Sequence, residues 1–151
     1  MATTSVSRNE VLPAVKRYGM VIELRPEKID EYKELHAAVW PDVLKMIAQC
    51  HIENYSIYLR KLADGRHYLF SYFEYSGSDF AGDMAKMAAD PLIQRWWAVC
   101  KPCHAPLPDR APEEWWAGME EVFHFTGTES PRSGVLSTLN SRFGAVWAAD
   151  I

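Results

Sequence analysis

Hydrophobic and polar residues repeat with helix and strand periods along the first third of the chain. Residues 18–24 (YGMVIEL) have the length and residue types of a β-strand. In residues 27–49, apolar or aromatic side chains recur at steps of three and four, which is one face of an α-helix. Pro26 favours the start of this helix, whereas Pro41 removes a backbone donor and should bend the helix beside Trp40. We therefore expect a strand followed by an interrupted helix.

The next segment has the two-residue period of strands. In residues 53–60 (ENYSIYLR), Tyr, Ile and Leu alternate with Asn, Ser and Tyr, and residues 67–75 (HYLFSYFEY) have a similar character. Asp64-Gly65 lies between the two stretches and is a strong hairpin signal. The pattern predicts a β-hairpin whose loop has two residues or slightly more.

Two helical pieces and a last strand complete the pattern. Residues 80–90 follow Ser-Gly-Ser-Asp, which offers an N-cap, and Pro91 divides them from the helical stretch 92–101 (LIQRWWAVCK). A proline-rich loop comes next. Residues 118–125 (GMEEVFHF) should then form a strand that closes the domain.

The element order β-α-β-β-α-β predicts an α+β protein with a ferredoxin-like fold. In that fold both helices cover one face of a four-stranded antiparallel sheet. The other face would be open and aromatic, so it must line a ligand cleft or pair with another subunit. We expect this domain at 17–126, between a flexible N-terminal arm at 1–16 and a C-terminal extension at 127–151 of undetermined role.

Composition narrows the class of protein. The chain has 151 residues, 48% of them hydrophobic and 24% charged, with a formal net charge of −4, as in ordinary soluble globular proteins. Basic residues are outnumbered, which disfavours a nucleic-acid partner. The sequence contains neither a membrane-spanning apolar run nor a signal peptide pattern, and its three cysteines argue against a disulfide framework. We therefore expect a cytoplasmic protein with no membrane partner.

Two aromatic motifs are candidates for chemistry. Tyr32 and His36 are neighbours on one helix face, and a histidine titrating near neutrality is a useful general acid or base. Trp96 and Trp97 point about 100° apart on a helix, so one can face the core while the other walls a cleft suited to the apolar face of a sugar. Core packing explains either spacing as well and, by spacing alone, is the favoured explanation.

A third motif is Cys100-Lys-Pro-Cys103-His104. Its spacing fits haem attachment, a redox pair or part of a zinc site. Haem attachment would require export, and Cys50-His51, distant in sequence, are the only companions for zinc. A structural role at a helix end is therefore favoured. The sequence has no Gly-rich phosphate loop, HExxH or GxSxG motif, which disfavours phosphoryl transfer, metalloproteolysis and serine hydrolysis.

In combination, four segments resemble the L-rhamnose mutarotase family, a branch of the dimeric ferredoxin-like proteins. The segments are EYKELHAAVWPDVL (31–44), NYSIYL (54–59), DPLIQRWW (90–97) and EEVFHF (120–125). The resemblance implies a homodimer with a dimeric α/β barrel-like assembly, a monosaccharide substrate and no cofactor or metal. The implied activity is exchange between the α and β anomers of L-rhamnopyranose.

The resemblance also implies roles for individual residues. His36 falls on the family's proton donor, and Tyr32, Tyr55, Trp96 and Trp97 fall on its sugar-binding positions. Anomer exchange requires ring opening with two proton carriers, and our hypothesis is that Tyr32 assists His36 or orients the sugar. The sequence does not indicate which sugar oxygen each residue serves.

Other functions stay open at this point. The loop 100–110 and the tail after Gly127 are longer than in compact family members, so another sugar such as L-fucose is an alternative substrate. A cofactor-independent ferredoxin-like monooxygenase that uses His, Trp and Asn would be compatible with Asn54 and the tryptophans. A non-catalytic small-metabolite-binding module would also have an aromatic cleft.

Overall fold

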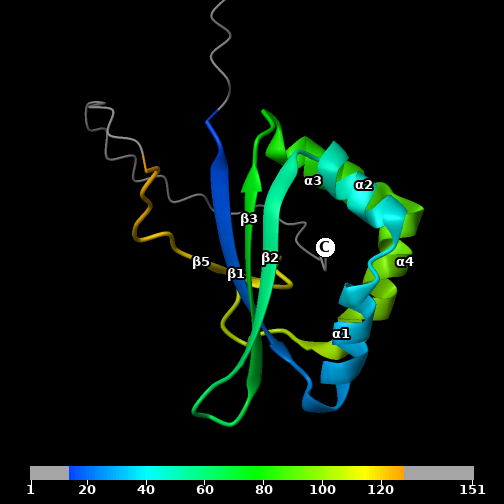
Figure 1. Cartoon of the computed structure of the whole chain (residues 1–151), viewed down its shortest axis with the longest axis vertical. Coiled ribbons are helices and arrows are strands. Elements are labelled where there is room, and N and C mark those ends of the chain that lie inside the picture. Colours follow the sequence, from blue (N-terminus) through cyan, green and yellow to red (C-terminus); the bar gives the residue numbers. More distant parts are fainter. Residues whose placement is uncertain (1–13, 128–151) are drawn as a thin grey trace, which may run out of the picture.

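An antiparallel sheet covered on one side by helices forms the part of the chain that the structure, a computed structural model, describes: residues 14–127 (Figure 1). Within this range no helix is long and apolar enough to cross a membrane. Short 3₁₀ turns occupy Pro26–Lys28 and Lys101–Cys103. The elements are β1 (Lys16–Leu24), α1 (Ile29–Ala37), α2 (Pro41–Gln49), β2 (Ile52–Lys61), β3 (His67–Tyr75), α3 (Phe80–Ala89), α4 (Pro91–Cys100), β4 (His104–Ala105) and β5 (Ala117–Met119).

The strands pair in the order β2-β3-β1-β4, and β5 also pairs with β1. Every pairing is antiparallel. The four α-helices found in residues 14–127 lie on the same side of this sheet (Figure 1). The expected ferredoxin-like α+β fold is therefore confirmed, with each expected helix divided into two. The expected number of strands is wrong, because the sheet within residues 14–127 has five strands where we expected four.

The period of two along the strands separates a core face from an open face. Ile22 of β1 lies opposite Leu69 of β3, which lies opposite Leu59 of β2, and this row faces the helices. Alternate residues such as Phe70 and Tyr58 share the other face, where the Tyr58 side chain is 64% exposed. Burial of the inner row supplies the main driving force for placing the helices on that side.

Prolines set the helix boundaries as expected. Trp40 has the extended conformation that precedes a proline (ψ 132°), and α2 begins at Pro41. Asp90 caps α4, because its Oδ1 accepts hydrogen bonds from the backbone N–H groups of Leu92 (2.8 Å) and Ile93 (3.1 Å). The predicted interruption is thus a complete break between α1 and α2, which lets the two helices follow the sheet at different angles (Figure 1).

The hairpin between β2 and β3 is confirmed, with a loop at 62–66. Gly65 has φ 82°, a left-handed conformation that glycine adopts without steric cost. Its N–H donates to the carbonyl of Leu62 (3.0 Å), and the Leu62 N–H donates to Arg66 (2.9 Å). The loop is slightly longer than a two-residue turn, as expected.

A β-bulge interrupts β2 at Asn54. Ile52 lies opposite Tyr75, but Ser56 lies opposite Tyr72, so β2 has one extra residue between them. Asn54 has φ 47°, which asparagine tolerates better than most residues. Because of the bulge, Ile52 and Tyr55 both point toward the helices although they are three residues apart.

The predicted last strand is wrong in extent. We expected residues 118–125, whereas β5 ends at Met119. The apolar side chains beyond it stay in solvent, with exposed fractions of 88% for Val122, 81% for Phe123 and 68% for Phe125. Alternation alone predicted a strand, but within one chain this segment buries too little apolar surface to fix it.

Two other expectations concern the ends and the connecting loop. β4 lies inside the proline-rich loop that we expected to be irregular. Most of the expected arm, 1–13, and most of the expected extension, 128–151, lie outside the described residues.

Candidate active site

Tyr32 and His36 form a stacked pair on α1. Their ring centroids lie 4.0 Å apart and their planes differ by 28°. The i, i+4 spacing places the two side chains on neighbouring turns of the helix. Tyr32 is 5% exposed and His36 is half-buried, so the pair lies at the boundary between the core and solvent.

A backbone contact sets the proton position on His36. His36 Nδ1 lies 2.9 Å from the carbonyl oxygen of Tyr32. A carbonyl oxygen only accepts, so Nδ1–H must be the donor. Neutral His36 therefore has its lone pair on Nε2, where it can take up a proton, and the imidazolium form can return one from the same atom.

The pair borders a hollow of about 270 Å³ between α1 and the sheet. Polar groups of α1 form one wall, and apolar side chains on the helix-facing side of β2 and β3 form the other. Such a combination of an apolar surface and a few polar groups is typical of small-molecule sites. The lining residues are Tyr32, Lys33, His36, Ala37, Ile57, Leu59 and Leu69.

The two tryptophans of α4 are both buried, with exposed fractions of 0% for Trp96 and 7% for Trp97. Trp96 contacts the ring of His36, with centroids 5.5 Å apart, and the ring of Trp40 at 5.2 Å. Neither indole N–H has a hydrogen-bond partner among residues 14–127. A buried donor without a partner costs about 1–3 kcal/mol, so a ligand hydroxyl or a water molecule would be favourable at either position.

Tyr55 lies on the inner face of β2, where its ring meets the edge of Phe73 with centroids 5.7 Å apart. It is two residues from Ile57, which lines the hollow. The structure therefore brings Tyr32, His36 and Trp96 into direct ring contact. Tyr55 lies near this group on β2, two residues from Ile57, and Trp97 is the residue after Trp96 on α4.

Sequence reasoning missed two residues beside this group. His104 is 1% exposed, and its ring centroid lies 5.4 Å from that of Tyr32. Ser71 is 3% exposed, lies opposite Ile57 in the sheet, and its hydroxyl has no partner within the described part of the chain. The CxxCH motif drew attention to His104 only as a metal or haem ligand, and nothing in the sequence marks Ser71.

The cysteines of that motif have a structural setting. Cys100 and Cys103 are fully buried, at the end of α4 and in the 3₁₀ turn after it. Between residues 14 and 127, no group of three or more His, Cys, Asp and Glu side chains is arranged to hold a metal ion. Both cysteine side chains belong to the hydrophobic core.

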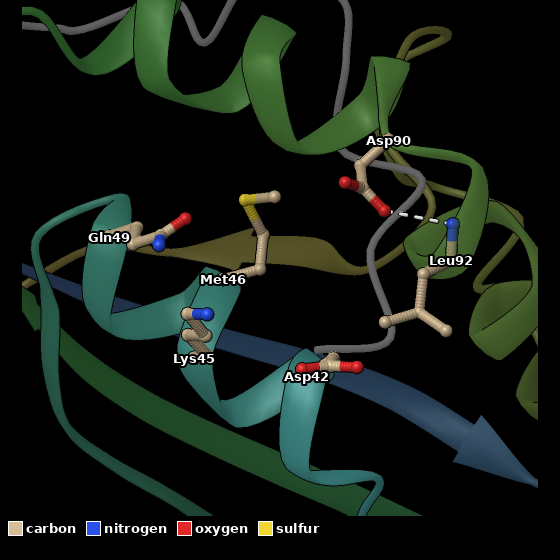
Figure 2. Close-up of a pocket in the computed structure, with 6 residues that line it drawn as sticks. All are labelled: Asp42, Lys45, Met46, Gln49, Asp90 and Leu92. Atoms are coloured by element: carbon tan, nitrogen blue, oxygen red, sulfur yellow. Dashed lines mark hydrogen bonds between the residues drawn. The ribbon is translucent and has the colours of Figure 1, made fainter.

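A second hollow, also of about 270 Å³, lies between α2 and the start of α4 (Figure 2). Its lining includes Asp42 and Lys45 of α2 and Asp90 before α4. The Asp90 carboxylate is engaged as the α4 cap, as the dashed line to Leu92 shows (Figure 2). This hollow lacks a stacked aromatic pair, and we regard the first hollow as the candidate site.

A hydrogen-bonded cluster near α3 lies away from the candidate site. Asp83 Oδ2 accepts from the hydroxyl of buried Tyr75 (2.6 Å) and contacts Nδ1 of His51 (2.9 Å). Burial opposes ionisation of Asp83, but these two hydrogen bonds, together with the nearby charges of His51 and Lys86, hold its pKa below the ordinary value. Burial, followed by the bond to Asp83, raises the pKa of Tyr75. The cluster therefore ties β3 to α3 with an ionised carboxylate.

Comparison with known sequences adds independent information. The profile of a family described as L-rhamnose mutarotase matches residues 17–125. An L-rhamnose mutarotase from Oceanobacillus iheyensis is 32% identical over 110 residues, covering 73% of this chain and 98% of the relative. An L-rhamnose mutarotase from Phocaeicola vulgatus has the same identity over the same length and coverage.

Solved structures show the same fold. An L-rhamnose mutarotase from Formosa agariphila superposes with a TM-score of 0.55 at 23% identity, covering 73% of this chain and 98% of that one. Tetracenomycin F2 cyclase from Streptomyces glaucescens, a polyketide cyclase, superposes with a TM-score of 0.56 at 12% identity, covering 75% and 99%. At these identities the superpositions concern the fold alone.

Proposed function

The chain belongs to the L-rhamnose mutarotase family, and from this premise we propose that it exchanges the α and β anomers of L-rhamnopyranose at the hollow beside Tyr32 and His36. This activity would make it an isomerase. The observation that carries the proposal is the stacked Tyr32–His36 pair, 4.0 Å between centroids, facing an apolar wall. The pair supplies two proton-exchanging groups beside a space for a small molecule.

The reaction requires only proton movements at two oxygens. A base removes the proton of the anomeric hydroxyl, an acid protonates the ring oxygen, and the bond between that oxygen and the anomeric carbon breaks. The open-chain aldehyde then rotates and recloses on its other face, with the same protons returned. No electrons leave the sugar, so this chemistry calls for no cofactor or metal.

His36 acts as the principal proton carrier in this proposal. Its Nδ1–H is held by the Tyr32 carbonyl, so exchange with the sugar takes place at Nε2. Tyr32 assists at the other oxygen or orients the sugar. General acid–base assistance of this kind contributes about 10²–10⁴-fold, and fixed positioning adds to it.

Aromatic residues around the pair bind the sugar. Trp96 and Trp97 offer indole N–H groups that have no partner in the described range, and these can donate to sugar hydroxyls. Tyr55 lies on the inner face of β2 beside the apolar wall. The 6-methyl group of L-rhamnose suits the surface of Ile57 and Leu59, which L-fucose would also meet.

The protein works as a homodimer in this proposal. The outer sheet face carries Tyr58, Phe70 and Tyr72, and the segment after β5 leaves Val122 and Phe123 almost fully exposed. Exposed apolar patches of this kind mark protein interfaces. A reducing compartment, the cytoplasm, is supported by the odd number of cysteines, three.

Proton NMR saturation transfer between the two anomeric signals tests the activity directly. The protein should accelerate exchange in L-rhamnose, and comparison with L-fucose measures its preference. Acceleration that persists unchanged in His36→Ala would contradict the assigned role. No acceleration with either sugar would overturn the proposed function.

A further inference from the structure

His104 belongs to none of the segments that carry the proposed reaction, yet its ring contacts Tyr32. The two centroids are 5.4 Å apart and the planes are tilted by 53°. His104 comes from β4, which is far from α1 in the sequence and is brought beside it by pairing with β1, where His104 lies opposite Leu24. Tyr32 therefore contacts one histidine of its own helix and one from the sheet.

Contacts on several sides hold His104 in place. Arg25 Nε donates to its carbonyl oxygen (3.0 Å), which fixes the backbone. The ring of Trp116 meets the imidazole edge to face, with centroids 5.3 Å apart. With 1% exposure, the imidazole has almost no freedom to move independently of these neighbours.

Trp115 also fixes the proton position on this imidazole. Its Nε1–H lies 3.2 Å from Nδ1 of His104. An indole N–H only donates, so Nδ1 must accept, and neutral His104 carries its proton on Nε2. This is the opposite tautomer from neutral His36, whose Nδ1–H donates to the Tyr32 carbonyl.

The chain segment that ends at His104 also contacts two tryptophans. Lys101 Nζ lies 5.1 Å from the ring centroid of Trp115 and 5.5 Å from that of Trp97. Trp115 is thereby held between His104 and Lys101. The segment from Lys101 to His104 is thus in contact with Tyr32 at one end and with Trp97 at the other.

Burial of a polar imidazole is costly compared with an aliphatic side chain of similar size. Core packing alone would not require the tryptophan N–H that is directed at Nδ1. We propose that His104 is a positioning residue, which, oriented by Trp115, holds the Tyr32 phenol against His36 in the geometry that proton exchange requires. This inference rests on the proposed function.

Substitutions at His104 and Trp115 test the inference through anomer exchange. His104→Leu keeps apolar volume but loses the imidazole, and Trp115→Phe removes the N–H donor while keeping an aromatic ring. Each should lower kcat for L-rhamnose exchange by about 10- to 10²-fold with little change in KM, because misplacement of a reacting group affects the rate more than binding. His104→Asn, whose amide oxygen can accept from Trp115, should recover part of the loss.

Nitrogen-15 NMR of the imidazoles gives a readout independent of activity. His104 should show a protonated Nε2 in the wild type and a mixture of tautomers in Trp115→Phe. His51→Gln, at the opposite end of the domain, is the matched histidine control and should exchange at the wild-type rate.

Each outcome has a definite meaning. An Nδ1–H tautomer in the wild type, or wild-type kcat in both His104→Asn and Trp115→Phe, would overturn the positioning role while leaving the mutarotase activity intact. A wild-type protein that does not accelerate exchange would instead overturn the proposed function, and this inference with it. Should His104→Leu fail to fold, Trp115→Phe and His104→Asn still decide the question.

Discussion

The Nδ1 atom of His36 lies 2.9 Å from the backbone carbonyl oxygen of Tyr32, the residue on which its ring also stacks. One residue thus supplies both the face that supports the imidazole and the acceptor that fixes its tautomer. The orientation of Nε2 consequently depends on the helical backbone, which substitution of the tyrosine hydroxyl leaves intact. The two members of the pair can therefore be tested separately.

His36→Asn separates the hydrogen bond from proton transfer. The asparagine amide can still donate to the Tyr32 carbonyl, but nothing replaces Nε2. We expect kcat for L-rhamnose exchange to fall by about 10²–10⁴-fold with KM nearly unchanged, measured by saturation transfer over a range of sugar concentrations. His51→Asn controls for loss of a histidine. A rate near the wild type in His36→Asn would exclude Nε2 as the proton carrier.

Tyr32→Phe retains the stacked ring and the carbonyl acceptor and removes only the hydroxyl. If that hydroxyl assists at the second sugar oxygen, kcat should fall by roughly tenfold or more, but less than in His36→Asn. Circular dichroism should show an unchanged fold. A raised KM with an unchanged kcat would instead assign the hydroxyl to sugar binding.

Trp97→Phe removes an indole N–H that has no partner within residues 14–127 while keeping an aromatic surface. Loss of one hydrogen bond to a sugar hydroxyl costs about 1 kcal/mol, so KM should rise about fivefold. The change in kcat should be smaller. The matched control is Trp40→Phe, because Trp40 also packs in this aromatic group, where its ring contacts Trp96. Trp115 is unsuitable as a control because it contacts His104. Equal effects of Trp97→Phe and Trp40→Phe would indicate a packing role.

The hydrogen bonds of Asp83 should make part of the free energy of unfolding depend on pH in the acid range. Its folded pKa is below the ordinary value, because the bonds from Tyr75 and His51 and the nearby charges together outweigh the effect of burial. The corresponding stabilisation is fully present above the ordinary carboxyl pKa of about 4 and is lost as the pH falls through the lower folded value. Urea unfolding of Asp83→Asn and wild type should therefore differ at neutral pH and converge as the pH falls through the folded pKa of Asp83.

The exposed carboxylate of Asp42 on α2 provides the matched comparison for the loss of one carboxylate. At neutral pH, Asp42→Asn should change the free energy of unfolding by about 0.5 kcal/mol or less, because the position is exposed. A gap between Asp83→Asn and wild type that stays constant at all pH values would show that the Asp83 contacts contribute without any linkage to protonation.

Phe123 tests the proposed homodimer. Its side chain is 81% exposed in the single chain, so Phe123→Asp should change the stability of a monomer by less than about 0.5 kcal/mol. If the segment after β5 is an interface, light scattering should show the mass falling from that of two chains to that of one. Leu44→Asp, at a 53% exposed position on α2, serves as the control. A two-chain mass in both variants would place the interface elsewhere.

The sequence predicted the elements that depend on local chemistry. Pro41, Pro91 and Gly65 act within a few residues of their own positions, so the helix breaks and the hairpin could be anticipated. The Tyr32–His36 contact could also be anticipated because both residues lie on one helix.

Contacts between distant segments could not be anticipated in this way. His104 meets Tyr32 only because β4 pairs with β1, and Trp115 reaches His104 from the loop beyond. The length of β5 was overestimated for a related reason. Alternation describes what a strand requires of its residues, but not whether a neighbouring surface is available to cover Val122 and Phe123.

The bulge at Asn54 changes the parity of β2. Before it, the even-numbered Ile52 faces the helices; after it, the odd-numbered Tyr55 and Ile57 do. If the strand ran regularly from Ile52 with all of its residues, Tyr55 and Ile57 would turn outward and Tyr58 inward; deleting Asn54 instead would give a regular strand in which all three keep their faces. Relatives of this protein that lack the bulge should therefore be one residue shorter between the positions of Ile52 and Ser56, with the same side chains facing the helices.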